Sequence, residues 1–182
     1  MKKITLIITA LFLMTFVVNA QHVFKKGDIG INAGIGMGGY GGSFPSIEVS
    51  GEFGSIPTED IGLISFGGVL GYKYSSYSYH YITSYEYNFS QIILGARAAW
   101  HLQTFTSDKW DAYAGLGFGL LLDSHYDSWD FEKEEAKRSA HTGGYGEFFI
   151  GGRMMTKSNF GFFAELGYNR LSFARVGITY LM

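Results

Sequence analysis

The residues of this chain whose side chains could best take part in chemistry are four acids and four bases. They lie in segments where apolar residues otherwise alternate with small or polar ones. They are Glu48, Glu52, Glu147, Glu165, Lys73, Arg97, Arg153 and Arg175. Glu165 and Arg175 are equidistant in sequence from Arg170, so a hairpin centred there pairs them across two strands, with Cβ atoms roughly 5 Å apart. Equal numbers of opposite charges predict mutual neutralisation, which is a structural role.

The serines and histidines raise the alternative of nucleophilic catalysis. Ser139 lies close to His141, and His125 follows Asp123 and Ser124. A serine activated by an adjacent base, which a third group orients, is a common arrangement for a nucleophile. No hydrolase motif surrounds these residues, so we assign no catalytic residue.

The first 20 residues have the layout of a cleaved secretory signal. Two lysines precede an apolar stretch over 4–18, and the small residue Ala20 ends the segment. A membrane anchor is the alternative, but a spanning helix needs about 20 apolar residues, and this run is shorter. We predict a signal peptide over 1–20, cleaved after Ala20, and one domain over 21–182.

The composition excludes several kinds of site. The chain has no cysteine, which excludes disulfides and thiolate metal sites. His125 with Asp123 and Asp127 is a sparse ligand set for a metal, and we expect neither metal nor cofactor. Without the two lysines of the signal, 12 of 14 bases remain against 16 acids, so no basic excess points to nucleic acid. The 26 glycines, 13 tyrosines and 16 phenylalanines suit a closed β-barrel.

Apolar side chains alternate with small or polar ones in eight segments. Period-two alternation predicts β-strands, and about ten residues is the length that a tilted strand needs to cross a bilayer. The predicted strands cover about 28–37, 46–53, 63–74, 89–102, 112–122, 145–155, 160–169 and 172–182. After residue 20 no apolar run is long enough for a membrane helix, so a membrane protein built from this chain must use strands.

The predicted connections alternate between short turns and longer loops, as in outer membrane barrels. Residues 55–61, 103–111 and 156–159 form the short set, and 123–143 is the longest loop. The tyrosine-rich segment 72–81 extends the third strand outward. We expect its tyrosines to belong to an interfacial aromatic girdle or, farther out, to offer a sheet edge to a partner.

The direction in which the charged side chains point distinguishes a membrane barrel from a soluble one such as a lipocalin. In a soluble barrel the apolar face points inward. Here one face is almost purely aliphatic and aromatic, while the other mixes glycine, serine and the eight charged residues. An eight-stranded barrel is just wide enough for its side chains to fill. We predict an all-β, eight-stranded antiparallel up-and-down transmembrane β-barrel with a closed, salt-bridged lumen.

The segment 175–182 holds the most specific motif. Gly177, Tyr180 and Met182 occupy the glycine, aromatic and final positions of a polar-x-Gly-x-x-aromatic-x-hydrophobic pattern. It resembles the β-signal by which outer membrane barrels engage the barrel-assembly machinery, although Met182 stands where an aromatic residue is usual. With 162–168, the segment looks like small outer membrane β-barrel proteins common in Bacteroidota and, more broadly, the OmpA/OmpX class.

That resemblance implies surface-exposed loops, a closed lumen and no cofactor, but it does not define a function. We expect a monomeric, non-enzymatic protein of the outer membrane that serves envelope structure or surface binding. Its expected partners are membrane lipids, the barrel-assembly machinery during insertion, and something bound by extracellular loops. A narrow, porin-like channel of the OmpW kind for small or apolar solutes is the first alternative, and a lipid A-modifying enzyme is the second.

Overall fold

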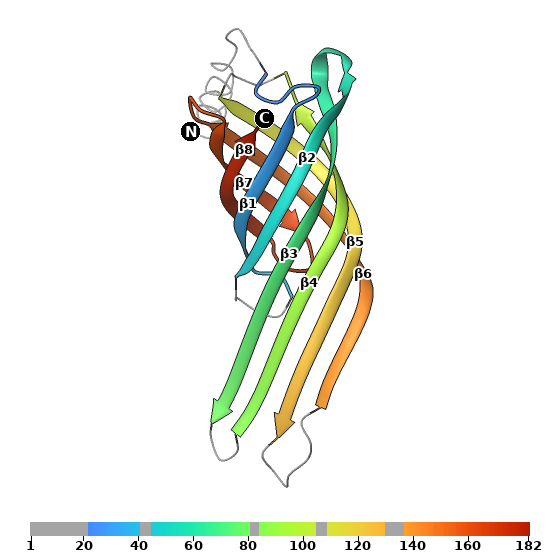
Figure 1. Ribbon diagram of the computed structural model, residues 1–182, viewed down its shortest axis with the longest axis vertical. Coiled ribbons are helices and arrows are strands. Elements are labelled where there is room, and N and C mark those ends of the chain that lie inside the picture. Colours follow the sequence, from blue (N-terminus) through green and yellow to red (C-terminus); the bar gives the residue numbers. More distant parts are fainter. Residues whose placement is uncertain (1–21, 41–44, 81–83, 105–108, 130–136) are drawn as a thin grey trace, which may run out of the picture.

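Eight strands, each paired with its sequence neighbours, close into one barrel (Figure 1). The computed structural model describes residues 22–40, 45–80, 84–104, 109–129 and 137–182. The strands are β1 (Ile29–Met37), β2 (Ser46–Thr58), β3 (Gly62–His80), β4 (Ser84–Leu102), β5 (Trp110–Trp129), β6 (Lys137–Met155), β7 (Phe160–Tyr168) and β8 (Ala174–Leu181). The predicted eight-stranded up-and-down barrel is confirmed, whereas the predicted signal peptide lies outside the described residues.

Little else in the described ranges is regular. A short 3-10 helix, η1 (Glu59–Ile61), connects β2 to β3. A search of these ranges for a helix of the length and apolarity needed to cross a membrane finds none.

The strand register defines how the barrel closes. A path that follows paired residues around the barrel starts at Leu63 on β3 and returns to β3 at Lys73. It runs through Leu63, His101, Tyr113, Gly151, Glu165, Arg175, Gly36, Ser46 and Lys73. The offset is 73 − 63 = 10 residues. With strands spaced about 4.8 Å apart and rising about 3.4 Å per residue, this offset tilts the strands by roughly 40° from the barrel axis.

The two ends of the barrel differ. β1 begins and β8 ends at the same end of the barrel, which we call the terminal end. We call the opposite end the hairpin end. Figure 1 shows β3 to β6 continuing past the other four strands at the hairpin end. β3 pairs with β2 only as far as Lys73 and then runs on to His80, a further 80 − 73 = 7 residues, or roughly 18 Å along the axis. We call this four-stranded extension the projecting sheet.

The projecting sheet corrects the prediction of a long loop over 123–143, which is wrong. Residues as far as Trp129 belong to β5 and residues from Lys137 belong to β6. Asp123 pairs with His141 across these strands. The backbone ladder therefore continues beyond the point where apolar alternation ends. The predicted extension of the third strand through the tyrosine-rich segment is confirmed, since β3 reaches His80.

The packing around Gly177 yields a testable prediction. A Cβ atom on Gly177 would lie 2.1 Å from the carbonyl oxygen of Ala33 and 2.8 Å from the ring of Phe163. We expect Gly177→Val to lower the free energy of unfolding by about 3 kcal/mol, at the upper end of overpacking costs, measured by urea titration in lipid vesicles. Thr179→Val is the matched control, because the buried Thr179 hydroxyl has no hydrogen-bond partner among the described residues. Equal unfolding midpoints for the two variants would contradict this account.

Candidate functional site

The barrel wall is apolar outside and polar inside. The outward side chains of Leu116 and Phe118 are 69% and 73% exposed. The eight charged residues singled out by the sequence all point into the lumen, and Glu52 is the least buried of them. A soluble barrel has the opposite arrangement, because burying charge while exposing aliphatic surface to water costs free energy on both counts.

Aromatic side chains gather at both margins of the outward apolar face. Toward the terminal end they are Phe53, Trp100, Trp110, Phe160 and Tyr180, and toward the hairpin end Tyr72, Tyr74, Phe148, Tyr168 and Phe173. Trp100 pairs with Ile64 on β3, and Tyr74 lies 74 − 64 = 10 residues farther along that strand. At a tilt of roughly 40° the step from Ile64 to Tyr74 is about 26 Å along the barrel axis. Trp100, on the neighbouring tilted strand, lies about 3 Å nearer to Tyr74, which leaves about 23 Å between these two residues.

The first lumen cluster lies toward the terminal end and joins four side chains. Arg153 forms ion pairs with Glu52 and with Asp111, whose Oδ2 lies 3.1 Å from Arg153 Nε. His101 Nδ1 lies 2.9 Å from Asp111 Oδ2, and His101 Nε2 lies 3.0 Å from Glu52 Oε2. Ser65 donates its hydroxyl proton to Glu52 Oε2. The cluster thus alternates acid and base around a ring.

The second cluster lies toward the hairpin end and joins two arginines to three glutamates. Arg97 contacts Glu147 at 3.0 Å and Glu165 at 3.1 Å. Arg175 reaches Glu165 at 2.9 Å, Glu48 at 3.1 Å and Glu147 at 3.4 Å. Glu165 and Arg175 are also direct cross-strand partners, which is the pairing that their equal spacing from Arg170 predicts.

Lys73 lies above the second cluster. Its ammonium group donates to the carbonyl oxygens of Gly38 at 2.6 Å and Leu171 at 3.2 Å. These carbonyls belong to the turns that follow β1 and β7. Lys73 therefore ties the two short hairpins to the long strand β3, in addition to contributing a positive charge to the lumen.

Several members of the network were not singled out from the sequence. Asp111 was assigned to a connecting segment over 103–111, and this boundary is wrong, because β5 begins at Trp110 and Asp111 is 3% exposed. Asp111, Tyr113 and the following alternate residues share the inward face, so extending the alternation by one residue pair would have found it. Asn169 is also missed: its amide donates to Glu48 Oε2 at 2.7 Å.

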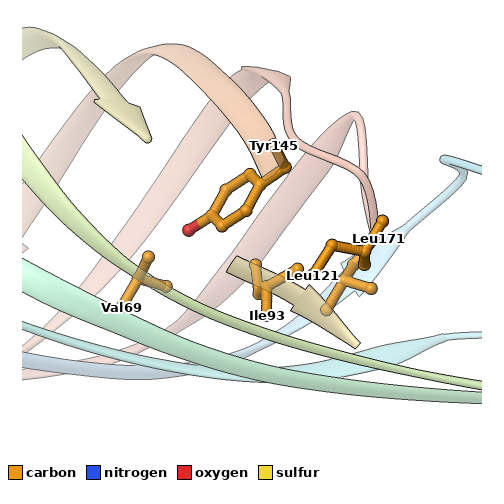
Figure 2. Packing of buried hydrophobic residues seen from close by; sticks show 5 residues of the cluster. All are labelled: Val69, Ile93, Leu121, Tyr145 and Leu171. Atoms are coloured by element: carbon orange, nitrogen blue, oxygen red, sulfur yellow. The ribbon is translucent and has the colours of Figure 1, made fainter. Parts of the chain in front are cut away.

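Apolar layers close the lumen above and below the charges. At the terminal end Phe24 packs with Leu63, Met155 and Leu181, and its ring lies 4.5 Å from that of His101. At the hairpin end Val69, Ile93, Leu121, Tyr145 and Leu171 form a second layer (Figure 2). Figure 2 shows Tyr145 on β6 reaching across toward Val69 on β3.

The space between the charged clusters is small. A cavity of about 10 Å³, lined by side chains that include Asn32, Ser65, Arg97 and Phe149, lies there. This volume accommodates about one water molecule. Arg97 also stacks on the Phe149 ring, with its guanidinium carbon 3.8 Å from the ring centroid. The described side chains therefore fill the barrel themselves.

The residues considered for catalysis lie in strands of the projecting sheet. The register pairs Asp123 with His141 and His125 with Ser139, while Ser124 lies on the opposite face because successive strand residues alternate. Asp123 Oδ2 is 3.9 Å from Arg170, and the His125 ring lies 4.7 Å from that of Phe89. The described residues contain no group of three or more histidine or acidic side chains that could hold a metal ion. The side chain of Asp127 is not among those that the structure describes.

The residues of the predicted assembly motif form the closing strand. Met182 exchanges two backbone hydrogen bonds with Ile29, at 2.7 and 2.9 Å. The ring of Tyr180 packs on that of Phe160 at the outer surface, with 4.7 Å between centroids. Gly177 contributes to the narrow interior described above. β8 thus joins β1 and completes the barrel.

The known proteins that this chain resembles are found among solved structures. No family model matches the chain, and no curated protein matches it. Ail, the attachment invasion locus protein of Yersinia pestis, solved in complex with the heparin analogue sucrose octasulfate, is 13% identical with a TM-score of 0.49, covering 86% of this chain and 96% of that chain. The N-terminal β-barrel domain of Pseudomonas aeruginosa OprF is 15% identical with a TM-score of 0.44, covering 86% and 98%. The closed barrel of this chain rests on its own strand register.

The first cluster predicts an asymmetric response to mutation. Arg153→Met would leave the carboxylates of Glu52 and Asp111 without their arginine partner, and we expect a loss of roughly 3–5 kcal/mol in the free energy of unfolding, as for a broken buried ion pair. Arg170, 29% exposed and 3.9 Å from Asp123, forms a longer and more exposed pair, so Arg170→Met should cost less, about 1 kcal/mol. Adding Glu52→Gln to Arg153→Met should recover part of the loss. Urea titration followed by tryptophan fluorescence measures all three, and equal losses for the two single variants would refute a closely coupled cluster.

Proposed function

We propose that this protein is a non-enzymatic, monomeric β-barrel of a bacterial outer membrane, closed to solutes, that acts at the cell surface through its projecting sheet. The observation that carries the proposal is the combination of an exposed apolar wall with an interior that holds paired charges. Such a wall is stable only when something other than water surrounds it. A closed barrel leaves no strand edge in that apolar surrounding.

The dimensions of the wall support a bilayer as that surrounding. Trp100 and Tyr74, one from each aromatic margin, are about 23 Å apart along the axis, and outer membrane barrels carry an apolar band about 25 Å tall between aromatic girdles. The basic and apolar segment over 1–20 supports export. The pattern of Gly177, Tyr180 and Met182 supports engagement of the barrel-assembly machinery during insertion.

A channel is the main functional alternative, and the filled lumen argues against it. Charged clusters, apolar layers and a cavity of about 10 Å³ leave no continuous path among the described residues. Opening a path would require breaking several buried ion pairs at once, each at a cost of roughly 3–5 kcal/mol.

Planar-bilayer recording tests the closed state. We expect the purified protein to give no steady single-channel steps at potentials where a general porin, recorded in the same bilayers, gives regular steps. Reproducible steps of uniform size from the wild-type protein would favour the OmpW-like channel and end the closed-barrel proposal.

The projecting sheet supports a role in surface binding. In the part of the chain that the structure describes, β6 pairs with β7 only from Phe148 onward, and β3 has no β2 partner beyond Lys73. Each flank of the sheet therefore presents backbone groups that a partner strand would pair with by strand addition. The sheet rises on the side away from the termini, which is the extracellular side when the short turns and termini face the periplasm.

A trimmed variant separates binding from anchoring. Two-residue Asn-Gly turns would replace 76–88 and 126–138, so that the pairs Ser75–Phe89 and His125–Ser139 become the last of their hairpins. We expect the trimmed barrel to insert and to keep its heat-modifiable gel migration. Held in nanodiscs and mixed with extracellular medium, the full-length protein should retain soluble proteins from the medium. The trimmed barrel should not retain them. Identical retention by both proteins would restrict the role of the chain to envelope structure.

A further inference from the structure

A shallow groove lies on the outward face of the projecting sheet, at its base. It has a volume of about 310 Å³ and is lined by Tyr74, Asn88, Phe89, Ser90, Ser124 and Tyr126. The strand register explains its shape. Ser90 on β4 pairs with Tyr74 on one side and with Ser124 on the other, and Asn88 pairs with Tyr126 in the next row. Small serine side chains form the floor, and tyrosine rings form the walls.

The height of the groove distinguishes it from the rest of the outward face. The row immediately toward the terminal end consists of Tyr72, Ile92 and Leu122, which are 46%, 38% and 46% exposed. That row ends the apolar wall. In a barrel inserted as proposed above, the groove lies at the level of the headgroups of the outer leaflet, directly above lipid chains.

The chemistry of the lining favours an uncharged, polyhydroxylated ligand. The outward side chains of the lining offer hydroxyl groups, one amide and two tyrosine rings, whereas the Phe89 ring lies on the inner face of the sheet. None of the described lining residues carries a charge. Asn88 Oδ1 is buried and has no hydrogen-bond partner among the described residues. An unpaired buried acceptor costs about 1–3 kcal/mol, so a ligand hydroxyl that draws the Asn88 amide toward the groove and donates to it would recover this cost.

We propose that this groove binds the sugar headgroup of an outer-leaflet glycolipid. A phosphate headgroup would need cationic or backbone N–H donors, and the described lining residues supply no cation. A lipid chain alone would leave the Asn88 acceptor unpaired. Strand addition by a protein uses the flanks of the sheet and leaves this face open. The inference rests on the proposed membrane insertion, and it adds a ligand class at a site distinct from the sheet flanks.

Native mass spectrometry of the full-length protein tests the proposal. The protein is reconstituted in vesicles of phosphatidylethanolamine and phosphatidylglycerol, with or without monoglucosyldiacylglycerol as the glycolipid probe. It is then released from the vesicles, and its mass with any bound lipid is measured. We expect the wild type to retain one glycolipid in preference to phospholipid. Ser124→Trp, which fills the groove, should reduce this retention at least tenfold, and Asn88→Leu should reduce it severalfold. Met37→Trp, at an exposed outward position on β1, is the matched control and should retain the glycolipid as the wild type does.

Each outcome bears on the proposal. Equal retention by wild type and Ser124→Trp, equal retention of phospholipid and glycolipid, or equally tight binding of free methyl glucoside without vesicles would overturn it. Heat-modifiable migration of every variant shows that the barrel has folded. Flotation of the protein with the vesicles tests insertion separately, so a protein that inserts without preferring the glycolipid refutes only this inference. A protein that does not insert refutes the proposed function.

Discussion

Eight strands closed with an offset of ten residues enclose a space so narrow that the side chains of the wall must fill it, and every other feature of the molecule depends on this constraint. Charged side chains are costly to enclose unless each is paired. The lumen meets that condition because acids and bases interleave in two clusters, and because Asn169 and Ser65 donate additional hydrogen bonds to Glu48 and Glu52. The outward face is then free to be entirely apolar.

The ion pairs connect strands that the backbone ladder does not. Hydrogen bonds between neighbouring strands define the cylinder, but each joins only adjacent elements. Glu52 on β2 reaches Arg153 on β6 across the lumen, and Arg97 on β4 reaches Glu165 on β7. These contacts brace the barrel across its diameter. Phe149 adds to the bracing, since its ring underlies the Arg97 guanidinium. The charged interior thus acts as the core of a protein whose apolar groups face outward.

The alternation of apolar and polar residues predicts those parts of the fold in which the two faces of each strand lie in different environments. Inside the barrel wall this contrast is strong, so the strands, the inward charges and the Glu165–Arg175 pair follow from spacing. Beyond the wall both faces of β5 and β6 are polar, the contrast disappears, and residues 123–129 and 137–143 read as a loop although their backbones pair. Contacts between distant strands, such as Glu52 with Arg153 and Arg97 with Glu165, depend on the offset at which the barrel closes, which alternation does not specify.

The unequal strand lengths determine which surfaces are left for interaction. On its inner face the projecting sheet packs over the mouth of the barrel: Phe89 lies against Tyr40 and His125, and Arg170 stacks on Tyr40 with 3.8 Å to the ring centroid. That face is therefore used in closing the lumen. The outer face and the two flanks have no such task. The described side chains leave a cavity of only about 10 Å³ in the lumen, so the proposed recognition rests on the outer face and the flanks of the projecting sheet.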